Sequence, residues 1–417
     1  MNKKKNRIER QIIAPKLRFP KFKKETKWEA LPGNKLFRQI SNKRHNSNLP
    51  ILAITQEYGA TPRDRINYHV SVTEQSIESY KVVEKGDFII SLRSFQGGIE
   101  YSKYKGLCSP AYIILRKKGN ILSQYFKHFF KTERFIRDLN KNIEGLRDGK
   151  MVSYKQFSEL MLPLPQSKDE QQSIADCLSA IDELLELESQ KLDSLRNQKK
   201  GMMYKLFSFD GKGLPLFRFP EFRNKPAWEE KSLGQYISQR TERNAKLKHN
   251  LVLSVSNKKG FISQAQQFDD YRVASSDLST YKIVYKDDIA YNPSRINVGS
   301  IAQLTNFKVG VVSPMYIVFH VKKELNPYFF LSLLGTPIFQ QKIKDACMGG
   351  VRDVLSFTSL ADFKFYRPGY DEQQKIADCL SSIDELIAAQ EEKFEKLKEH
   401  KKGLLQQLFP SYEEIAL

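Results

Sequence analysis

The stretch DEQQSIADCLSAIDEL at residues 169–184 returns as DEQQKIADCLSSIDEL at residues 371–386, with 14 of 16 positions identical. A shorter motif, RFP at residues 18–20, recurs at residues 218–220. The offset between matching positions stays between 200 and 205 residues along the chain. Self-similarity at one period marks a repeated structural unit. The chain is therefore one unit of about 200 residues, written twice.

Both copies of this stretch have the features of a long helix. Asp169 and Asp371 each follow a proline-bearing segment and open a polar turn, which is typical of a helix N-terminus. From Ile174 and from Ile376 onward, positions spaced alternately four and three residues apart are mostly apolar. Eight of ten such positions are apolar in each copy, which predicts a coiled-coil seam. The predicted seam is Ile174, Leu178, Ile181, Leu185, Glu188, Leu192, Leu195, Lys199, Met202 and Leu206, with Ile376, Leu380, Ile383, Ile387, Gln390, Phe394, Leu397, Lys401, Leu404 and Leu408.

The polar seam positions favour an antiparallel pair of helices. A parallel pair in the repeat register would place Lys199 beside Lys401, and a buried like-charge pair is costly. An antiparallel pair can place Glu188 opposite Lys401 and Lys199 opposite Gln390. We therefore predict an antiparallel coiled coil with pseudo-twofold symmetry, each helix spanning about 39 residues and about 58 Å. The alternative is that each helix packs only on its own domain.

The rest of each copy differs in sequence and predicts mixed domains. Short runs of β-branched and aromatic residues, such as 82–92 and 283–291, are broken by Gly, Pro and Asn, as in strands joined by turns. We expect an α+β fold with two such domains joined by the two long helices. The predicted boundaries are 1–168 and 208–370 for the domains and 169–207 and 371–410 for the helical regions.

Positive charge is concentrated in the two domains. The chain has 68 Lys and Arg against 48 Asp and Glu, a net charge of +20. Residues 1–168 hold 34 basic and 15 acidic residues, and residues 209–370 hold 23 and 14. The helical segments 169–208 and 371–417 are acidic, with 5 basic against 8 acidic residues and 6 against 11. A basic surface that only contacts solvent would not explain why the positive charge is separated so cleanly from the helices. The pattern therefore predicts that both domains bind nucleic acid.

Composition and motifs argue against several other classes of protein. No apolar run approaches the roughly 20 residues of a membrane span and the start lacks the features of a secretory signal, so we expect a cytoplasmic protein. The four cysteines form no CxxC pair and the histidines lack metal-ligand spacing, so neither a disulfide framework nor a metal site is expected. Because no glycine-rich nucleotide loop, HExxH or GxSxG motif occurs, we expect no catalytic residues.

One segment is similar to a catalytic motif without matching it. Residues 291–294, YNPS, resemble the Asn-Pro-Pro-aromatic loop of amino methyltransferases, but the second proline and the aromatic residue are absent. We interpret it as a base-reading loop, because Arg suits guanine and Gln or Asn suits adenine. The candidate DNA-binding residues are Arg93, Ser94 and Gln96 in the first domain and Ser294, Arg295 and Asn297 in the second.

A second pair of candidates precedes each helix. Arg147 with Lys150 lies before the first helix, and Arg352 lies before the second. Asp148 and Asp353 directly follow the two arginines, so salt bridges within each domain are an equal alternative. Features common to both copies are poorly suited to reading different bases, so these arginines could hold phosphates instead.

The layout itself implies a function. Two basic domains of different sequence, held at a distance by a rigid helix pair, would read two different DNA half-sites, with the gap set by helix length. The repeated DEQQ-x-IADCLS-x-IDEL motif, with RFP-x-F and Trp-Glu opening each half, resembles the specificity (S) subunit of type I restriction-modification systems. The resemblance covers essentially the whole chain.

This resemblance implies partners and cofactors that the chain itself does not carry. Each half would comprise a target recognition domain and a conserved helical region, and the chain would be a non-catalytic subunit. Two modification (M) subunits would methylate adenine with S-adenosylmethionine, and restriction (R) subunits would use ATP and Mg²⁺ to cleave DNA. Double-stranded DNA would be the ligand.

Two other functions stay open at this point. A coiled-coil adaptor could bind DNA or RNA by charge alone, although such a binder has no need of two divergent domains. A chain of this kind could also serve methylation partners alone, without restriction subunits.

Overall fold

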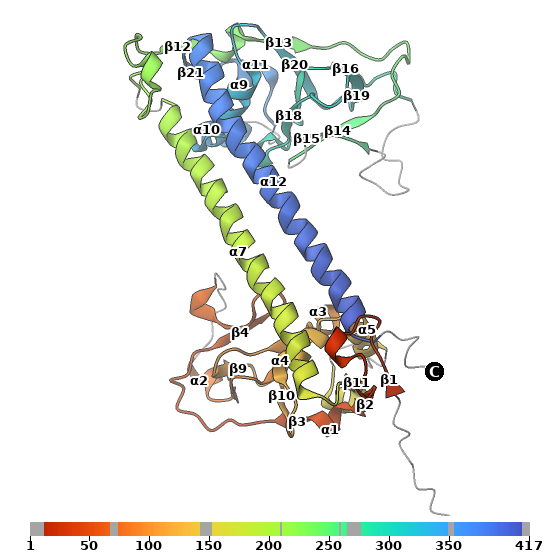
Figure 1. Cartoon of the computed structure of the whole chain (residues 1–417). Coiled ribbons are helices and arrows are strands. Elements are labelled where there is room, and N and C mark those ends of the chain that lie inside the picture. Colours follow the sequence, from red (N-terminus) through yellow and green to blue (C-terminus); the bar gives the residue numbers. More distant parts are fainter. Residues whose placement is uncertain are drawn as a thin grey trace, which may run out of the picture. The chain divides into compact units, whose positions relative to one another are not determined.

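The computed structural model describes residues 12–66, 74–141, 152–208, 211–257, 260–264, 277–348 and 354–410. They belong to two compact units: unit 1 comprises residues 1–189 with 393–417, and unit 2 comprises residues 190–392. Each unit contains one mixed α+β domain and part of both long helices (Figure 1). The predicted fold class is confirmed.

The two long helices are α7 (Lys168–Leu206) and α12 (Tyr370–Leu408), each of 39 residues. Their bounds lie within two residues of the helical regions expected from the repeat. Asp169 and Glu170 stand in the first turn of α7, and Asp371 and Glu372 in that of α12, where negative charge is favoured by the helix dipole.

Unit 1 is built on two antiparallel sheets. One has the order β1-β2-β11, and the other has the order β3-β10-β7-β8. The described residues of the domain also form two further strand pairs, β4-β5 and β6-β9. The strands are β1 (Ile12–Ile13), β2 (Trp28–Pro32), β3 (Phe37–Ile40), β4 (Leu52–Thr55), β5 (Gly59–Pro62), β6 (Lys81–Val83), β7 (Phe88–Ile90), β8 (Glu100–Tyr101), β9 (Gly106–Cys108), β10 (Ile113–Lys117) and β11 (Met161–Leu164).

Unit 2 repeats this topology. The order β13-β20-β17-β18 matches β3-β10-β7-β8, and the pairs β14-β15 and β16-β19 match β4-β5 and β6-β9. The pair β12-β21 matches β2-β11, and the described part of unit 2 has no strand in the place of β1. The predicted run 283–291 contains two strands with a turn between them, as does 82–92. The strands are β12 (Glu229–Ser232), β13 (Ile237–Arg240), β14 (Leu253–Ser256), β15 (Gly260–Ser263), β16 (Lys282–Tyr285), β17 (Ile289–Tyr291), β18 (Ile301–Gln303), β19 (Val309–Val312), β20 (Ile317–Val321) and β21 (Lys364–Arg367).

Short helices cover the sheets in both units. In unit 1 they are α1 (Gly33–Leu36), α2 (Glu74–Ile77), α3 (Ser94–Gly97), α4 (Ser123–Phe129), α5 (Glu133–Asn140) and α6 (Tyr154–Glu159). In unit 2 they are α9 (Pro327–Leu334), α10 (Pro337–Met348) and α11 (Phe357–Ala361). Single-turn 3₁₀ helices are η1 (Pro20–Phe22), η2 (Arg63–Arg65), η3 (Pro220–Phe222), η4 (Leu233–Gln235) and η5 (Ile296–Val298).

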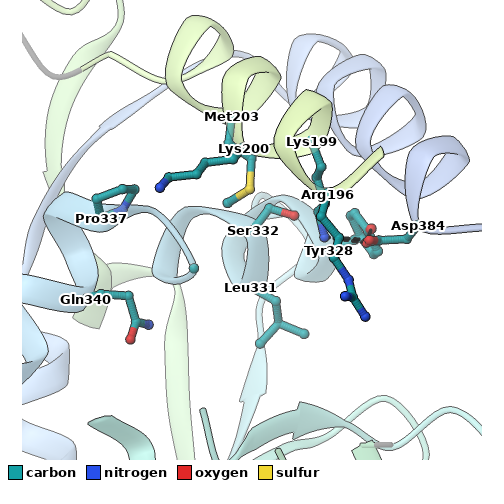
Figure 2. A pocket seen from close by; sticks show the side chains of 11 residues that line it. Arg196, Lys199, Lys200, Met203, Tyr328, Leu331, Ser332, Pro337, Gln340 and Asp384 are labelled. Atoms are coloured by element: carbon teal, nitrogen blue, oxygen red, sulfur yellow. Dashed lines mark hydrogen bonds and ion pairs between the residues drawn. The ribbon is translucent and has the colours of Figure 1, made fainter. Parts of the chain in front are cut away.

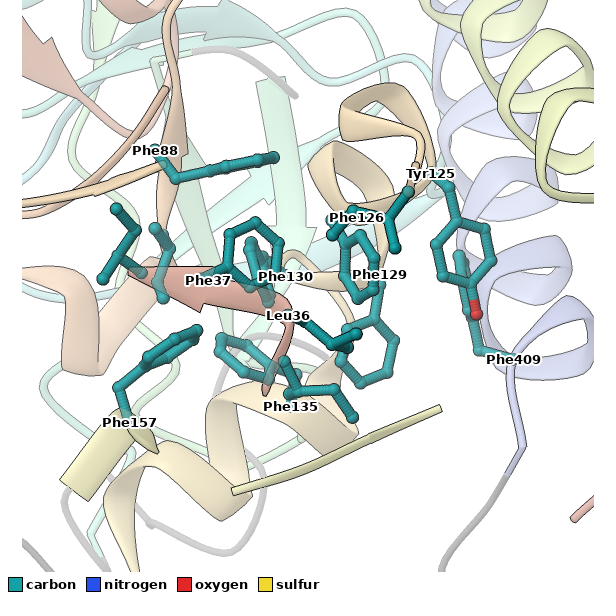
Figure 3. Packing of buried hydrophobic residues seen from close by; sticks show 14 of the residues in the cluster. Leu36, Phe37, Phe88, Tyr125, Phe126, Phe129, Phe130, Phe135, Phe157 and Phe409 are labelled. Carbon is teal, nitrogen blue, oxygen red and sulfur yellow. The ribbon is translucent and has the colours of Figure 1, made fainter. Parts of the chain in front are cut away.

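The core of unit 1 is rich in aromatic rings (Figure 3). Residues of both long helices belong to it. The Phe37 ring lies 5.0 Å from Phe126 and 5.6 Å from Phe88, both nearly perpendicular, which is a favoured ring geometry. Leu178 of α7 and Phe409, next to the end of α12, belong to the same buried cluster. The helix ends are thus part of the domain core as well as of the helix pair.

In the described part of the chain, no helix is long and apolar enough to cross a membrane. Nor do the described His, Cys, Asp and Glu side chains form a cluster of three or more that could hold a metal ion.

Candidate nucleic-acid interface

Each domain is clamped to the start of its long helix by an ion pair between the two repeated motifs. In unit 1, Nε and Nη2 of Arg18 donate to the two carboxylate oxygens of Glu170, at 2.7 and 2.8 Å. In unit 2, the same atoms of Arg218 donate to Glu372 at 2.8 and 2.9 Å. The Arg of RFP and the Glu of DEQQ therefore form one bidentate contact, which is the strong geometry for this pair.

The first glutamine after each of these glutamates joins the helix to the domain. Gln171 accepts from the backbone N–H of Leu122 at 2.9 Å and donates to the Pro165 carbonyl at 2.9 Å. Gln373 accepts from the N–H of Asn326 at 2.8 Å and donates to the Pro368 carbonyl at 3.0 Å. Both side-chain amides are buried, and a buried polar group without a hydrogen bond destabilises the fold. Each of these hydrogen bonds therefore avoids that cost.

In the sequence these motifs are recognisable only as repeat markers and a helix start, so the clamp was not predicted. The available signal was that one arginine and one glutamate recur in both copies at matching places. Trp28 and Trp228, which follow RFP, are buried core residues at 0% and 5% exposure.

The contacts within each unit show that α7 and α12 run antiparallel. In unit 1, Asp182 pairs with Lys401 at 2.5 Å, whereas Glu188, further along α7, pairs with the earlier residue Lys393 at 2.5 Å. In unit 2, Lys199 pairs with Asp384 at 2.6 Å, whereas Arg196, earlier in α7, pairs with the later residue Glu391 at 2.5 Å. All twenty predicted seam residues are buried or half-buried, in keeping with a seam.

The predicted partners of the polar seam residues were wrong. Lys401 and Lys199 bind Asp182 and Asp384 rather than Glu188 and Gln390. The prediction paired seam positions only with each other, but a lysine side chain is long enough to leave the seam and reach a flanking carboxylate. Both aspartates stand one residue after an apolar seam position, and the prediction left them out.

Asp182 and Asp384, which occupy equivalent positions in the repeat, also bind side chains of their own domains. Lys127 of α4 donates to Asp182 at 2.8 Å, and the Tyr328 hydroxyl of α9 donates to Asp384. Burial acts to raise the pKa of Asp182, but Lys401 and Lys127 outweigh it and hold that pKa below its usual value. Each aspartate therefore joins both long helices to its domain.

The first candidate loop, residues 91–98, lies between the central strand β7 and the edge strand β8. Arg93 and Gln96 are exposed on it. Ser94 is 1% exposed and its hydroxyl accepts from the Ser91 N–H at 2.9 Å, so it supports the loop from inside. Of the three candidates in this loop, only Arg93 and Gln96 therefore present an exposed side chain to a base.

This loop is held rigidly from beneath. Lys131 donates to the Gly97 carbonyl at 2.9 Å, and Asn140 donates to the Phe95 carbonyl at 2.6 Å. Gly98 has φ of +80°, and a Cβ there would lie 1.9 Å from the Phe130 carbonyl oxygen, so glycine is required. A preorganised loop loses little conformational entropy when it binds a ligand.

The second candidate loop, residues 292–299, occupies the same place between β17 and β18 in unit 2. Ser294 and Arg295 are exposed, and Asn297 is half-buried. The Asn297 Oδ1 accepts no hydrogen bond from the part of the chain that the structure describes. The Leu355 N–H donates to the Pro293 carbonyl at 3.1 Å, which anchors this loop as well. The two loops are equivalent in position and different in side chains.

A hairpin tip that was not predicted from the sequence lies beside the loop in unit 1. Gln56, in the turn between β4 and β5, packs on Gly97, where an added Cβ would come within 2.4 Å of it. The neighbouring Tyr58 is 56% exposed. In unit 2, Asn257 stands at the equivalent turn beside Gly299. Neighbours across a sheet edge leave no signal in a single sequence, so only the fold brings these residues to the loop.

The candidates before each helix, Arg147, Lys150 and Arg352, lie outside the described residues. Their alternative roles, base reading, phosphate contact and salt bridges, therefore stay predictions.

Comparison with known proteins identifies the repeat. The family model described as the type I restriction modification DNA specificity domain matches residues 31–197 and again residues 227–399. The chain is 24% identical over 360 residues to the type I restriction enzyme MjaVIII specificity subunit of Methanocaldococcus jannaschii, covering 81% of this chain and 80% of that protein. A putative type I specificity subunit of Mycoplasma genitalium is 21% identical over 398 residues, with coverage of 85% and 98%.

Solved structures agree on the fold. The type I restriction-modification S subunit from M. genitalium has a TM-score of 0.59 at 17% identity, over 96% of this chain and all of that one. A chain from a study of complex assembly and conformational transition of the type I restriction-modification system has a TM-score of 0.52 at 13% identity, with coverage of 92% and 98%. With the specificity domain matched in both halves, the chain belongs to the type I restriction-modification specificity subunits, which recognise DNA sequence.

Proposed function

We propose that this chain reads a bipartite, asymmetric DNA site, with one half-site for each unit and a gap set by the two long helices. The observation that carries the proposal is the pair of equivalent loops. One scaffold is built twice, and the same anchored position presents Arg93 and Gln96 in unit 1 but Ser294 and Arg295 in unit 2. Different side chains at one docking position are what two different half-sites require.

The charge distribution supports DNA as the ligand of both units. The two domains carry the basic excess, and the long helices are acidic. Lysine and arginine contacts to phosphates would supply affinity that weakens with salt, while the loops would supply the choice of sequence.

The chain serves as a non-catalytic scaffold in this proposal. Modification subunits methylate adenine with S-adenosylmethionine, and restriction subunits use ATP and Mg²⁺; both dock on this chain, which contributes no catalytic residue. Its place of work is the cytoplasm, where its DNA substrate would be met.

The test is methylation mapping. The chain is co-expressed with its modification subunit in a host without other adenine methylation, and methyladenine is mapped across the genome. We expect one motif with two short specified halves and an unspecified gap. Arg93→Ala should relax one half, and Arg295→Ala the other, each by about 1 to 3 kcal/mol of discrimination against the wrong base.

Two outcomes would contradict the proposal. A single contiguous motif would exclude the bipartite arrangement, and a change in both halves from one substitution would exclude one reader per unit. The charge-only adaptor predicts no motif at all, with the same affinity and the same steep salt dependence for every DNA sequence.

A further inference from the structure

A pocket of about 520 Å³ opens in unit 2 between the end of α7, the α9–α10 corner and the start of α12 (Figure 2). Its apolar wall includes Met203, Leu331 and Pro337. Its charged groups are Arg196, Lys199, Lys200 and Asp384, so the lining has three cations and one carboxylate. The proposed DNA-reading loop does not contribute to it.

Two of the three cations already have partners. Lys199 pairs with Asp384 at 2.6 Å, and Arg196 pairs with Glu391 at 2.5 Å. Lys200 is exposed and forms no ion pair or hydrogen bond with the part of the chain that the structure describes. Figure 2 shows its side chain extended toward the Pro337 end of the pocket.

Unit 1 shows what this lysine position binds when a carboxylate is available. The residue equivalent to Lys200 is Lys402, and it pairs with Glu133, the first residue of α5, at 2.8 Å. The second carboxylate oxygen of Glu133 accepts from Gln406 at 3.3 Å. The hydrogen bond to Lys402 lowers the pKa of Glu133 and raises that of Lys402, so both groups are charged at neutral pH.

In unit 2 the equivalent of Glu133 is Pro337, the first residue of α10. The replacement removes the carboxylate and leaves the lysine without its partner. Neighbouring replacements make room as well, because Leu331 and Ser332 stand where unit 1 has Lys127 and His128. The pocket is therefore the same corner of the fold as in unit 1, emptied of its internal acid.

We propose that this pocket binds an acidic side chain of the modification subunit, with Lys200 as the counter-charge. This rests on the proposed function, because the partner is the subunit that the chain recruits. The apolar wall would pack on the stem of a Glu or Asp, and the first turn of α10 favours a negative charge beside it. The site thus supplies from a partner what Glu133 supplies within unit 1.

DNA is the poorer occupant of the same pocket. Asp384 and Glu391 lie beside the cations, and residues 371–417 hold 11 acidic against 6 basic residues. A DNA backbone would bring a row of negative phosphates against this acidic helix, which repels them. A single carboxylate needs only one cation without a partner.

The test compares three variants of the full chain for binding to the purified modification subunit. Lys200→Gln removes the counter-charge and should weaken binding about tenfold, as expected for a charged contact worth about 1.4 kcal/mol. Pro337→Glu places an internal acid where unit 1 has Glu133, which fits a helix start and should block the pocket to the same degree. The matched control, Lys402→Gln, should bind within twofold of the wild type, because unit 1 supplies its own acid.

The combined variant Lys200→Gln/Pro337→Glu should lose no more than either single variant, because both act on one contact. Equal binding by Lys200→Gln and wild type would overturn the inference, as would a loss in Lys402→Gln of the same size. Reduced DNA affinity of Lys200→Gln, with unchanged binding to the modification subunit, would assign the pocket to phosphate instead. If the wild type itself does not bind the modification subunit, the proposed function fails, and this inference fails with it.

Discussion

Glu170 is 1% exposed, and both of its carboxylate oxygens accept hydrogen bonds from Arg18. Glu170→Gln keeps the shape but leaves a largely buried guanidinium without its counter-charge. Breaking such a pair costs about 3 kcal/mol, which corresponds to roughly 6 to 12 °C in the unfolding temperature of a unit of this size. Thermal unfolding followed by circular dichroism measures the shift. The control is Glu183→Gln, an exposed residue of the same helix; equal stability of the two variants would exclude the clamp.

The contrast between what the sequence predicts here and what it does not is physical. The aspartate that opens each DEQQ motif predicts a helix start because its effect is local. The glutamate acts on an arginine 152 residues earlier in the chain, and only the fold brings the two together. The same reason explains Ser94, which a sequence pattern offers as a base reader but the loop buries.

His128 makes unit 1 sensitive to acid. It is 2% exposed, and its Nε2 lies 3.1 Å from the Ser179 hydroxyl, with Lys127, Asp182 and Lys401 around it. Burial, reinforced by Lys127, lowers its pKa to about 3, whereas the unfolded value is about 6.5. Between about pH 3 and pH 6.5 the ring is therefore neutral in the folded state and protonated in the unfolded state. Its contribution to stability is therefore complete above about pH 6.5 and declines as the pH falls toward 3.

His128→Gln removes this contribution and should make the unfolding temperature fall less steeply between pH 6.5 and pH 4. The difference between variant and wild type at each pH separates this histidine from the carboxylates that both proteins share. Unit 2 has Ser332 at the equivalent position, so Ser332→Gln is the matched control and should leave the slope unchanged. Parallel curves for His128→Gln and wild type would show that the ring titrates normally in the folded protein.

At the scale of elements, the register of α7 against α12 is set by pairs that a heptad pattern does not contain. The seam positions and the antiparallel direction follow from apolar spacing and from avoidance of like charges. The partners do not, because lysines reach flanking carboxylates such as Asp182 and Asp384. Strand order is likewise invisible in the short apolar runs, and only the structure shows that the equivalent sheets of the two units share it.

A charge swap tests this register. Glu188 is nearly buried and pairs with Lys393, so Glu188→Lys should place two lysines together and destabilise the helix pair by about 1 to 3 kcal/mol. Adding Lys393→Glu should restore most of the loss. The register expected from seam positions alone would instead be rescued by Lys401→Glu. Thermal unfolding of the three variants decides between them, since rescue by Lys401→Glu and not by Lys393→Glu would overturn the observed pairing.

At the scale of the whole molecule, the repeat divides the work between constant and variable parts. Both units contain the Arg–Glu ion pair, the buried glutamine and the aspartate of the long helix, with nearly the same distances. The two loops are therefore presented in the same way. The exposed side chains of the two loops differ. A scaffold of this kind can change what it reads without changing how it is assembled, which is why sequence conservation within the chain marks structure and divergence marks specificity.

The proposed role of the helices leads to a test on the whole chain. One heptad is added to each helix in phase with its seam, a copy of residues 176–182 after Ser189 and of residues 379–385 after Glu392. Seven helical residues add about 10.5 Å, the length of about three base pairs, so the gap in the methylated motif should widen by one to three base pairs. Both half-sites should stay as they are, because no loop is touched.

An insertion in α7 alone is the control and should abolish methylation by breaking the register. Altered half-sites in the doubly lengthened chain would mean that the helices take part in reading bases, and an unchanged gap would mean that they do not set the spacing.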